Sequence, residues 1–372
     1  MDTGVATGTV LGTALGTTLG TAAGRRSRAW VPRRVLVTPS ALMWPAGAAM
    51  VERAAALGTE VVRLPADRLT GLPDAYRDAK TTLAVVVASP SRRRLQPIPP
   101  SADWRFDLAE GCPAHCSYCY LAGSLAGPPI IRAYANLPEV LAGLAPAVGH
   151  GEVTSRSMDR AAEGTTFECS CYTDPLAIEH LTGHLAACIQ HFGAWHAPVQ
   201  LRFTTKFDAV GSLLGLAHNR RTRIRFSVNA NGAEQHEGGA PRMAARLAAL
   251  RAVAGAGYPV GLTVAPILRL PDWAAAYDRL FADVAAALGG VPGVDLTAEL
   301  ITHRFTPRSK AVLAGWYPGS PLEMNEAGRA RKTTKFGSVK WVFPKEGMAE
   351  MRVALEASLA RHLPAARVLY WT

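Results

Sequence analysis

The 372-residue sequence contains no apolar run of 18 or more residues, so we expect no transmembrane helix and no membrane partner. It has only six cysteines, which is too few for a disulfide scaffold in a chain of this length. Lysine is also scarce, because seven of the 40 basic residues are lysines and the rest are arginines. These absences exclude a disulfide-stapled secreted protein and a helical membrane protein.

The chain nevertheless carries a formal net charge of +11 and has 49% hydrophobic residues. The hydrophobic content is typical of a globular protein. A GC-rich genome can explain the preference for arginine over lysine, but it does not explain the excess of basic over acidic residues. Arginine binds phosphate through two parallel hydrogen bonds. The charge therefore favours a nucleic acid as the partner.

The first 100 residues divide into a tail and a small module. Residues 1–29 form a Thr/Gly/Ala tract without the basic start of a signal peptide, and we expect a disordered tail or a misassigned start. Residues 30–100 predict an α/β module with strands at 34–37, 60–64 and 81–87 and a helix at 46–57. The module ends in a proline-containing linker over residues 89–100, which carries three consecutive arginines, Arg92 to Arg94. We expect this linker to be extended and exposed.

Residues 101–329 alternate between β-rich runs and helical patterns. Strands are expected near 104–109, 165–169, 199–205, 223–228, 259–264 and 294–301, with amphipathic stretches such as 176–192, 242–254 and 273–288 between them. This alternation predicts parallel βαβ units, and six units are too few for a closed eight-stranded barrel. Residues 330–372 add an expected hairpin around 338–343, a helix at 346–362 and a strand at 367–371.

Half of the cysteines stand in one short loop. Cys112, Cys116 and Cys119 have the spacing C-x3-C-x2-C, which matches three corners of a four-iron, four-sulfur cluster and leaves one iron open. A single zinc ion needs a fourth ligand, and His115 is awkwardly placed between two of the cysteines to supply it. The alternative is a zinc or iron–sulfur site that only stabilises the loop. Metal-binding thiolates must stay reduced, so we expect a cytoplasmic protein.

Candidate functional residues stand at or just after the carboxyl end of every expected strand, where functional residues of such barrels gather. They are the cysteine loop and then residues 169–174, 204–206, 227–229, 265–266 and, on the last strand, Glu299 with 303–304. Lys206 is among them. A buried lysine needs a partner, such as the carboxylate of a ligand, although most lysines are simply exposed.

The string Gly-Cys-Pro-Ala-His-Cys-Ser-Tyr-Cys-Tyr-Leu at 111–121 resembles the radical S-adenosylmethionine (SAM) superfamily and, within it, the spore photoproduct lyase family. Later segments resemble this family in the same order, over roughly residues 30–372. The resemblance implies an α/β fold, namely a partial (β/α)6 radical SAM barrel with a small N-terminal α/β module and a C-terminal β-hairpin and helix extension.

The resemblance also implies an activity. The family is a group of carbon–carbon lyases that use a [4Fe–4S] cluster and SAM to repair DNA. They revert a methylene-bridged thymine dimer to two thymines through a 5′-deoxyadenosyl radical. The implied partners are UV-damaged DNA and an electron donor such as a flavodoxin or a ferredoxin.

The family's cofactor residues can be placed on this chain. The cluster ligands fall on Cys112, Cys116 and Cys119, and the SAM contacts fall on Tyr118, Thr173, Lys206 and Ser227. Lys206 and Ser227 would contact the methionine end of SAM. Thr173 stands where the family has a serine, and Tyr118 would touch the adenine.

The implied hydrogen donor is Cys171, because the chain reads Phe-Glu-Cys-Ser-Cys at 167–171 where the family has Phe-Glu-Ala-Ser-Cys. Cys169 is an addition to the pattern and, on a strand, would point to the same side as Cys171. It can be a fourth cluster ligand, a disulfide partner or a packed residue, and packing is favoured. Tyr118 and Tyr120 would relay a hydrogen atom back toward SAM, unless they only pack over the cofactor.

The segment 329–341 is basic with interleaved aromatic residues, a pattern that can bind phosphates and wedge beside a flipped base. The family places a lesion-binding hairpin here, with Arg-Tyr-Gly where this chain has Lys335, Phe336 and Gly337, so one hydroxyl is lost. The expected DNA contacts are Arg304, Lys335, Phe336 and Lys340, and the alternative is an ordinary solvated basic loop.

Two other functions fit parts of the sequence. The first is a radical SAM enzyme of the same family that acts on a different nucleic acid or small molecule. The second is a non-enzymatic iron–sulfur protein that binds DNA, which would leave Lys206 and Ser227 without a role.

Overall fold

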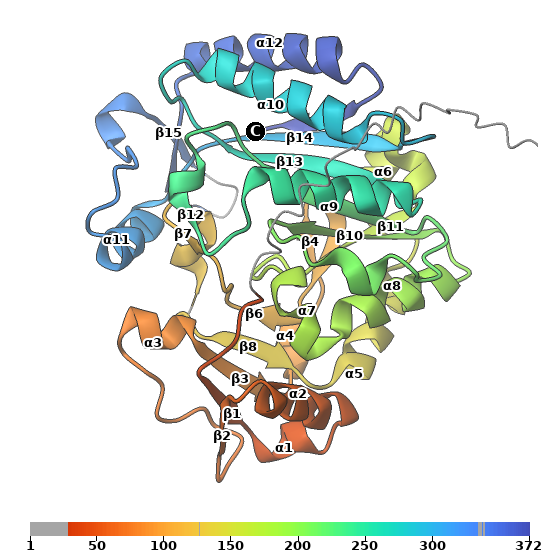
Figure 1. Cartoon of the computed structure of the whole chain (residues 1–372), viewed down its shortest axis with the longest axis vertical. Helices are drawn as coiled ribbons and strands as arrows, with labels where there is room; N and C mark the ends of the chain where they lie inside the picture. Colours follow the sequence, from red (N-terminus) through yellow and green to blue (C-terminus); the bar gives the residue numbers. More distant parts are fainter. Residues whose placement is uncertain (1–28, 126, 334–336, 338) are drawn as a thin grey trace, which may run out of the picture.

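The computed structural model describes residues 29–125, 127–333, 337 and 339–372 (Figure 1). Most of the tail expected at 1–29 therefore lies outside the described residues, and so do Lys335 and Phe336. Two sheets organise the described chain, a smaller one built mainly from the first strands and a larger one above it in Figure 1. In the described part of the chain no helix combines the length and apolarity needed to cross a membrane.

The larger sheet has eight strands in the order β17-β14-β13-β11-β10-β9-β5-β4. Six of them are the strands of the expected barrel: β5 (Ala102–Phe106), β9 (Thr165–Cys169), β10 (Val199–Thr205), β11 (Thr222–Val228), β13 (Val260–Ile267) and β14 (Leu296–Thr302). They pair in parallel, and β17 (Arg367–Trp371) continues the parallel order. The short strand β4 (Gln96–Ile98) closes the other edge in antiparallel pairing. The result is an open half-barrel, which confirms the predicted α/β fold class.

Four long helices pack against this sheet (Figure 1): α8 (His184–Ala194), α9 (Met243–Gly255), α10 (Trp273–Leu288) and α12 (Lys345–His362). Their buried apolar residues join those of the strands in one large core. The stretch expected as one amphipathic unit at 176–192 is broken at Gly183, which has a φ of 66°. A short 3-10 turn, Leu176–Ile178, and α7 (Glu179–Thr182) precede that glycine, whose left-handed backbone ends the first helix.

The smaller sheet has the order β2-β1-β3-β8-β6. Its first three strands, β1 (Arg34–Val37), β2 (Glu60–Arg63) and β3 (Thr82–Val86), were expected, and α2 (Pro45–Ala56) packs on them. Its other two, β6 (Ala109–Glu110) and β8 (Ile131–Tyr134), come from beyond residue 100 and were not expected. The cysteine loop therefore leaves the smaller sheet through β6 and returns to it through β8.

Gly111 forms the base of that loop. It has a φ of 81°, and a Cβ at this position would lie 2.2 Å from the carbonyl oxygen of Ile130. Only glycine fits a backbone approach of this kind. The loop is thus held closed where it leaves and rejoins the sheet.

The remaining elements are short. The linker at 89–100 is extended only in β4, because α4 (Pro90–Arg93) forms a helical turn with proline at its start. In the C-terminal hairpin, β15 (Ala330–Thr333) pairs antiparallel with β16 (Val339–Val342). Other short segments are α1 (Pro39–Leu42), α3 (Tyr76–Lys80), β7 (His115–Cys116), α5 (Leu137–Ala142), α6 (Val153–Arg156), β12 (Glu237–Gly238) and α11 (Pro307–Trp316).

Candidate active site

A cavity of about 580 Å³ lies at the carboxyl ends of the parallel strands. Every predicted site residue that the structure describes lines it: Cys112, Cys116, Tyr118, Cys119, Tyr120, Cys171, Thr173, Lys206, Ser227, Arg304 and Lys340. These residues come from strands and loops that are up to 228 positions apart between Cys112 and Lys340. The layout expected from parallel strand ends is therefore the observed one.

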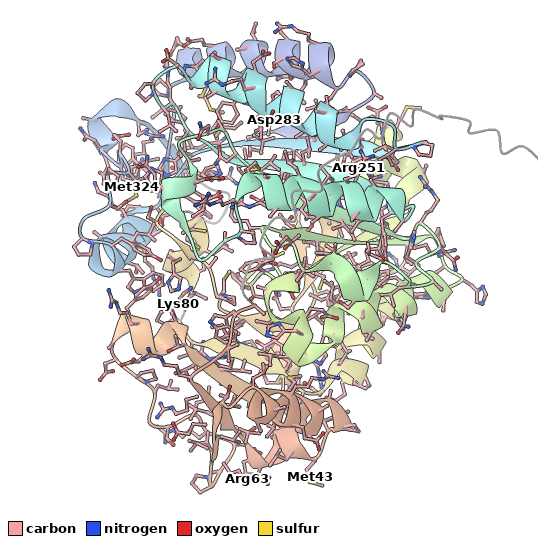
Figure 2. The ribbon with its side chains drawn as sticks, in the orientation of Figure 1. Met43, Arg63, Lys80, Arg251, Asp283 and Met324 are labelled. Carbon is pink, nitrogen blue, oxygen red and sulfur yellow. The ribbon has the colours of Figure 1, made fainter. Side chains whose placement is uncertain are left out.

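The cysteine loop is fixed from two sides. Lys80, at the end of α3, is buried and donates hydrogen bonds to the carbonyl oxygens of Cys112 and Ala114. Figure 2 shows this lysine in the region between the two sheets. On the other side β7 pairs antiparallel with β12, which places Cys116 opposite Glu237.

The donor set of the loop suits an iron–sulfur cluster. All three cysteines are free and face the cavity. Burial raises the pKa of Cys112 to about 11 and that of Cys116 to about 12, so these thiols keep their protons until a metal replaces them. Within the described residues no three His, Cys, Asp or Glu side chains converge on a single ion. A four-iron cluster does not require that convergence, because it binds each thiolate through a different iron.

Lys206 is partly buried and paired. Its Nζ lies 2.7 Å from Ser227 Oγ and 2.9 Å from Glu237 Oε1, and its side chain is 15% exposed. Asp174 accepts a hydrogen bond from the Lys206 backbone at 2.7 Å and fixes the end of β10. Lys206 is therefore not an ordinary exposed lysine. The ammonium points into the cavity beside a hydroxyl, as a carboxylate ligand would require.

Glu237 connects this lysine to the cysteine loop, and sequence reasoning missed it. Its carboxylate accepts hydrogen bonds from the Tyr118 hydroxyl and Lys206 and is paired with Arg246. Burial would raise the pKa of Glu237, but the charges of Lys206 and Arg246 outweigh burial and hold that pKa below its usual value. Tyr118 donates to a carboxylate that stays ionised. No motif in the sequence marks Glu237, because its role depends on the pairing of β12 with the loop.

Four residues that line the cavity have a buried polar atom without a partner among the described residues. These atoms are Thr173 Oγ1, Arg225 Nε, His303 Nε2 and Thr372 Oγ1. Burial lowers the pKa of His303 to about 3, so its ring is neutral. A buried polar atom without a partner is costly unless a ligand or water satisfies it. Together with the Lys206 ammonium, these atoms suit a polar ligand such as SAM.

Cys169 and Cys171 do not point to the same side, and that expectation is wrong. Strand β9 ends at Cys169, and Ser170 has a φ of 60°, which turns the chain. Cys169 is 1% exposed, packs in the core beside Cys188 and does not line the cavity. Cys171 does line it. Burial raises the pKa of Cys171 well above its usual value, so the sulfur carries its hydrogen.

The mouth of the cavity is basic and aromatic. The Arg304 guanidinium carbon lies 5.4 Å from the Tyr120 ring centroid. Lys340 extends from β16, and burial together with the nearby Arg304 lowers its pKa. Tyr120 is 36% exposed, whereas Tyr118 is 7% exposed and lies deeper. Trp316 and Tyr317, which end α11 and also line the cavity, were not expected from the sequence.

Buried ion pairs fill the barrel side of the cavity. Arg225 pairs with Glu168 and, at 2.6 Å, with Glu299, which also pairs with Arg202 at 2.7 Å. The Tyr370 hydroxyl of β17 donates to Glu299 at 3.0 Å. These side chains come from β9, β10, β11, β14 and β17, so the network fixes the strand ends relative to one another.

An open parallel half-barrel with a three-cysteine loop at its strand ends, above a ligand-sized cavity, defines the class of radical SAM enzymes. A sequence model described as spore photoproduct lyase matches residues 30–372. The chain is 38% identical to the spore photoproduct lyase of Geobacillus sp. (strain Y412MC61), covering 93% of this chain and 100% of that one. It is 35% identical to the enzyme of Bacillus subtilis (strain 168), covering 92% and 99%. The chain belongs to the spore photoproduct lyase family.

Solved structures agree with this assignment. A mutant spore photoproduct lyase with bound AdoMet and dinucleoside spore photoproduct superposes with a TM-score of 0.85 at 36% identity. The superposition covers 93% of this chain and 100% of that chain. A spore photoproduct lyase complexed with dinucleoside spore photoproduct gives the same values.

Proposed function

We propose that the chain cleaves the methylene bridge of the spore photoproduct in DNA and restores two thymines. The observation that carries this proposal is the cavity, where all the described residues of the predicted site meet. The similar structure with AdoMet and the dinucleoside lesion supports the same ligands here. The cavity of about 580 Å³ falls within the usual range for small-molecule sites.

Different residues of the chain would bind the two cofactors. Cys112, Cys116 and Cys119 would hold a [4Fe–4S] cluster, and Lys206, Ser227 and Thr173 would hold SAM, with Tyr118 beside it. When bound, the cluster and SAM supply the radical chemistry that opens the lesion. The protein orients the reacting groups and excludes water.

Cys171 then completes the repair. Once the bridge breaks, the methylene carbon keeps an unpaired electron and needs one hydrogen atom to become a methyl group. The Cys171 S–H supplies that atom, and its sulfur becomes a thiyl radical. Tyr118 and Tyr120 would return a hydrogen atom to the sulfur, and the hydrogen atom first removed from the lesion would restore the tyrosine O–H, so that the radical passes back toward the SAM site. Burial raises the pKa of Tyr118 well above its usual value, so its O–H stays intact for this step.

Arg304 and Lys340, with Lys335 and Phe336 outside the described residues, would contact the damaged DNA. The positive charge of Arg304 and Lys340 at the cavity mouth suits the phosphate backbone. The electron would come from a small redox protein such as a flavodoxin or a ferredoxin. The cysteines of the described chain are all free, which supports a reducing compartment, the cytoplasm.

The test is repair of synthetic dinucleoside spore photoproduct by the anaerobically reconstituted protein with SAM and a reductant. We expect release of thymidine. The lysine and phenylalanine at 335–336, which replace the family's Arg-Tyr, favour one second candidate, a family member with a different substrate. Cleavage of SAM without thymidine release would support that candidate and reject the repair function.

A further inference from the structure

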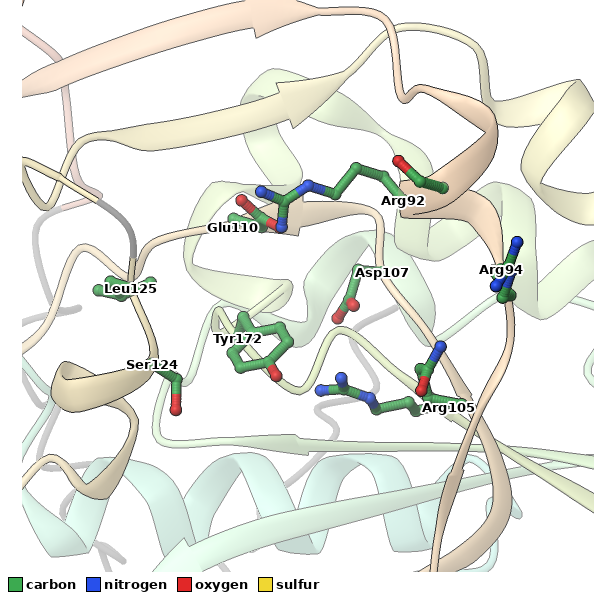
Figure 3. Close-up of a pocket in the computed structure, with 10 residues that line it drawn as sticks. Arg92, Arg94, Arg105, Asp107, Glu110, Ser124, Leu125 and Tyr172 are labelled. Atoms are coloured by element: carbon green, nitrogen blue, oxygen red, sulfur yellow. The ribbon is translucent and has the colours of Figure 1, made fainter. Parts of the chain in front are cut away.

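A second, smaller pocket of about 200 Å³ is drawn in Figure 3. It adjoins the large cavity. Leu125 and Tyr172 line both spaces, so they form the wall between them. Three arginines line the smaller pocket: Arg92, Arg94 and Arg105. Arg92 and Arg94 belong to the arginine triplet of the linker, for which the proposed repair reaction gives no role.

The three arginines differ in whether a nearby carboxylate already neutralises the charge of the guanidinium group. Arg92 pairs with Glu110, and its triplet neighbour Arg93 pairs with Glu139 away from the pocket. Arg94 is exposed and makes no hydrogen bond or ion pair with any residue that the structure describes. Arg105 has no carboxylate within ion-pair distance in the described chain, and its guanidinium carbon lies 4.5 Å from the Tyr172 ring centroid. Arg94 is therefore free to bind an anion, and Arg105 is partly so, because Tyr172 and the charge of Asp107 already act on its guanidinium.

The backbone places Arg94 and Arg105 at the same edge of the larger sheet. Residue Gln96 of β4 stands opposite Arg105 of β5 in the antiparallel register, and Arg94 lies two residues before Gln96. Asp107 lies on the same side of the pocket (Figure 3), and its buried Oδ1 has no partner in the described chain. Burial raises the pKa of Asp107 to about 6, so this carboxyl is mostly protonated, and able to donate to an oxygen of an anion, only below about pH 6.

We propose that this pocket binds a backbone phosphate of the damaged strand, next to the lesion, through Arg94 and Arg105. The proposal rests on the proposed function, because it assumes that a nucleic acid enters the large cavity. Arginine matches the two-oxygen geometry of a phosphodiester. A strand whose lesion fills the large cavity must continue past its wall, and Tyr172 directly follows the proposed hydrogen donor Cys171 in the chain. A phosphate held here would fix the lesion relative to that thiol.

The test uses the reconstituted holoenzyme and a short single-stranded oligonucleotide that contains one spore photoproduct. Each phosphate flanking the lesion is replaced in turn by a neutral methylphosphonate, and affinity is measured by fluorescence anisotropy. For the unmodified chain, one of these replacements should weaken binding about tenfold, the loss expected for one charge-assisted contact. Arg94→Ala should cause a similar loss and lower the salt slope by about 1.

The decisive experiment combines the two changes, the neutral phosphate and Arg94→Ala. When the critical phosphate is already neutral, Arg94→Ala should cost almost nothing further, since the two changes remove the same contact. The matched control is Arg63→Ala, which removes the same charge from an exposed site at the far end of the molecule (Figure 2). Arg94 is exposed and has no partner among the described residues, so its removal should not disturb folding.

Three outcomes would overturn the proposal: additive losses for Arg94→Ala at every phosphate, a loss no larger than that of Arg63→Ala, or an equal loss with the dinucleoside lesion. The dinucleoside has no flanking phosphate, so thymidine release from it tests the repair function separately. A failure of the phosphate pocket and a failure of the repair function are thus told apart by different substrates.

Discussion

Glu237 gives a prediction whose size follows from the structure. Its carboxylate is 1% exposed and serves Tyr118, Lys206 and Arg246 at once. Removing one partner of a buried ion pair typically costs about 3–5 kcal/mol, because the remaining charge is left without compensation. We expect Glu237→Gln to lower the free energy of unfolding by an amount within this range.

The smaller end of that range, about 3 kcal/mol, applies to Glu237→Gln. Arg246 keeps its hydrogen bonds to the carbonyls of Pro241 at 2.9 Å and Ser227 at 3.1 Å, and Lys206 keeps Ser227 Oγ. The amide oxygen of glutamine still accepts from Tyr118. Glu237→Ala removes that acceptor as well and leaves a void, so its cost should lie near 5 kcal/mol.

Urea denaturation of the two variants at several pH values is the assay. The folded-state pKa of Glu237 is lowered, so its contribution is present above about pH 4.5, its ordinary value, and is lost as the pH falls through the lower folded-state pKa. The difference between the unmodified chain and Glu237→Gln should therefore shrink in acid. A loss below about 1 kcal/mol at neutral pH, or one that does not change in acid, would refute the reasoning.

Three further predictions concern the proposed chemistry. Cys112→Ala should abolish the four-iron absorption spectrum and SAM cleavage, whereas a tightly held zinc without iron in the unmodified chain would contradict the cluster. Cys171→Ala should leave the cluster and SAM binding intact, but it should slow repair and yield off-path lesion adducts that mass spectrometry detects. The core variant Cys169→Ala should yield no such adducts. The reverse pattern would mean that the hydrogen donor lies two positions earlier, at Cys169. Lys340→Ala should weaken binding of lesion-bearing duplex and lower its salt slope by about 1, and an unchanged slope would count against this phosphate contact.

Long apolar elements could be predicted from the sequence because local patterns define them. Strands β9, β10 and β17 and helix α10 begin and end at the predicted residues. Strand β5 was predicted two residues too late, since it contains a buried Asp103, which a hydrophobicity pattern treats as a boundary. That carboxylate is satisfied by Thr166 at 2.8 Å and by the backbone of Val153 at 2.7 Å, neither of which a local pattern reveals.

The missed elements depend on contacts between distant parts of the chain. Strand β8 has only four residues and becomes a strand by pairing Leu83 with Ile131. Lys80 on α3 and Glu237 on β12 support the cysteine loop from two sides, and nothing near either residue in the sequence indicates that role. The site residues were found because each lies in a motif, whereas the residues that hold them in place lie outside one.

Ser170 shows where the alternation of side chains along a strand stops being a reliable guide. Side chains two apart on a strand share a face, but a non-glycine residue in the left-handed region is uncommon and ends that regularity. The Ser170 hydroxyl accepts from the Leu108 backbone at 3.1 Å, and its own N–H donates to Phe106 at 2.8 Å. These contacts with β5 and its loop stabilise the turn that separates Cys169 from Cys171.

The most direct test of the account is repair of the dinucleoside lesion by the unmodified protein in D2O, followed by mass spectrometry of the products. The S–H of Cys171 faces the cavity and exchanges with solvent. We therefore predict two thymidines per lesion, one of which carries a single deuterium in its methyl group. Unchanged lesion after SAM has been consumed, or thymidine without deuterium, would contradict the account.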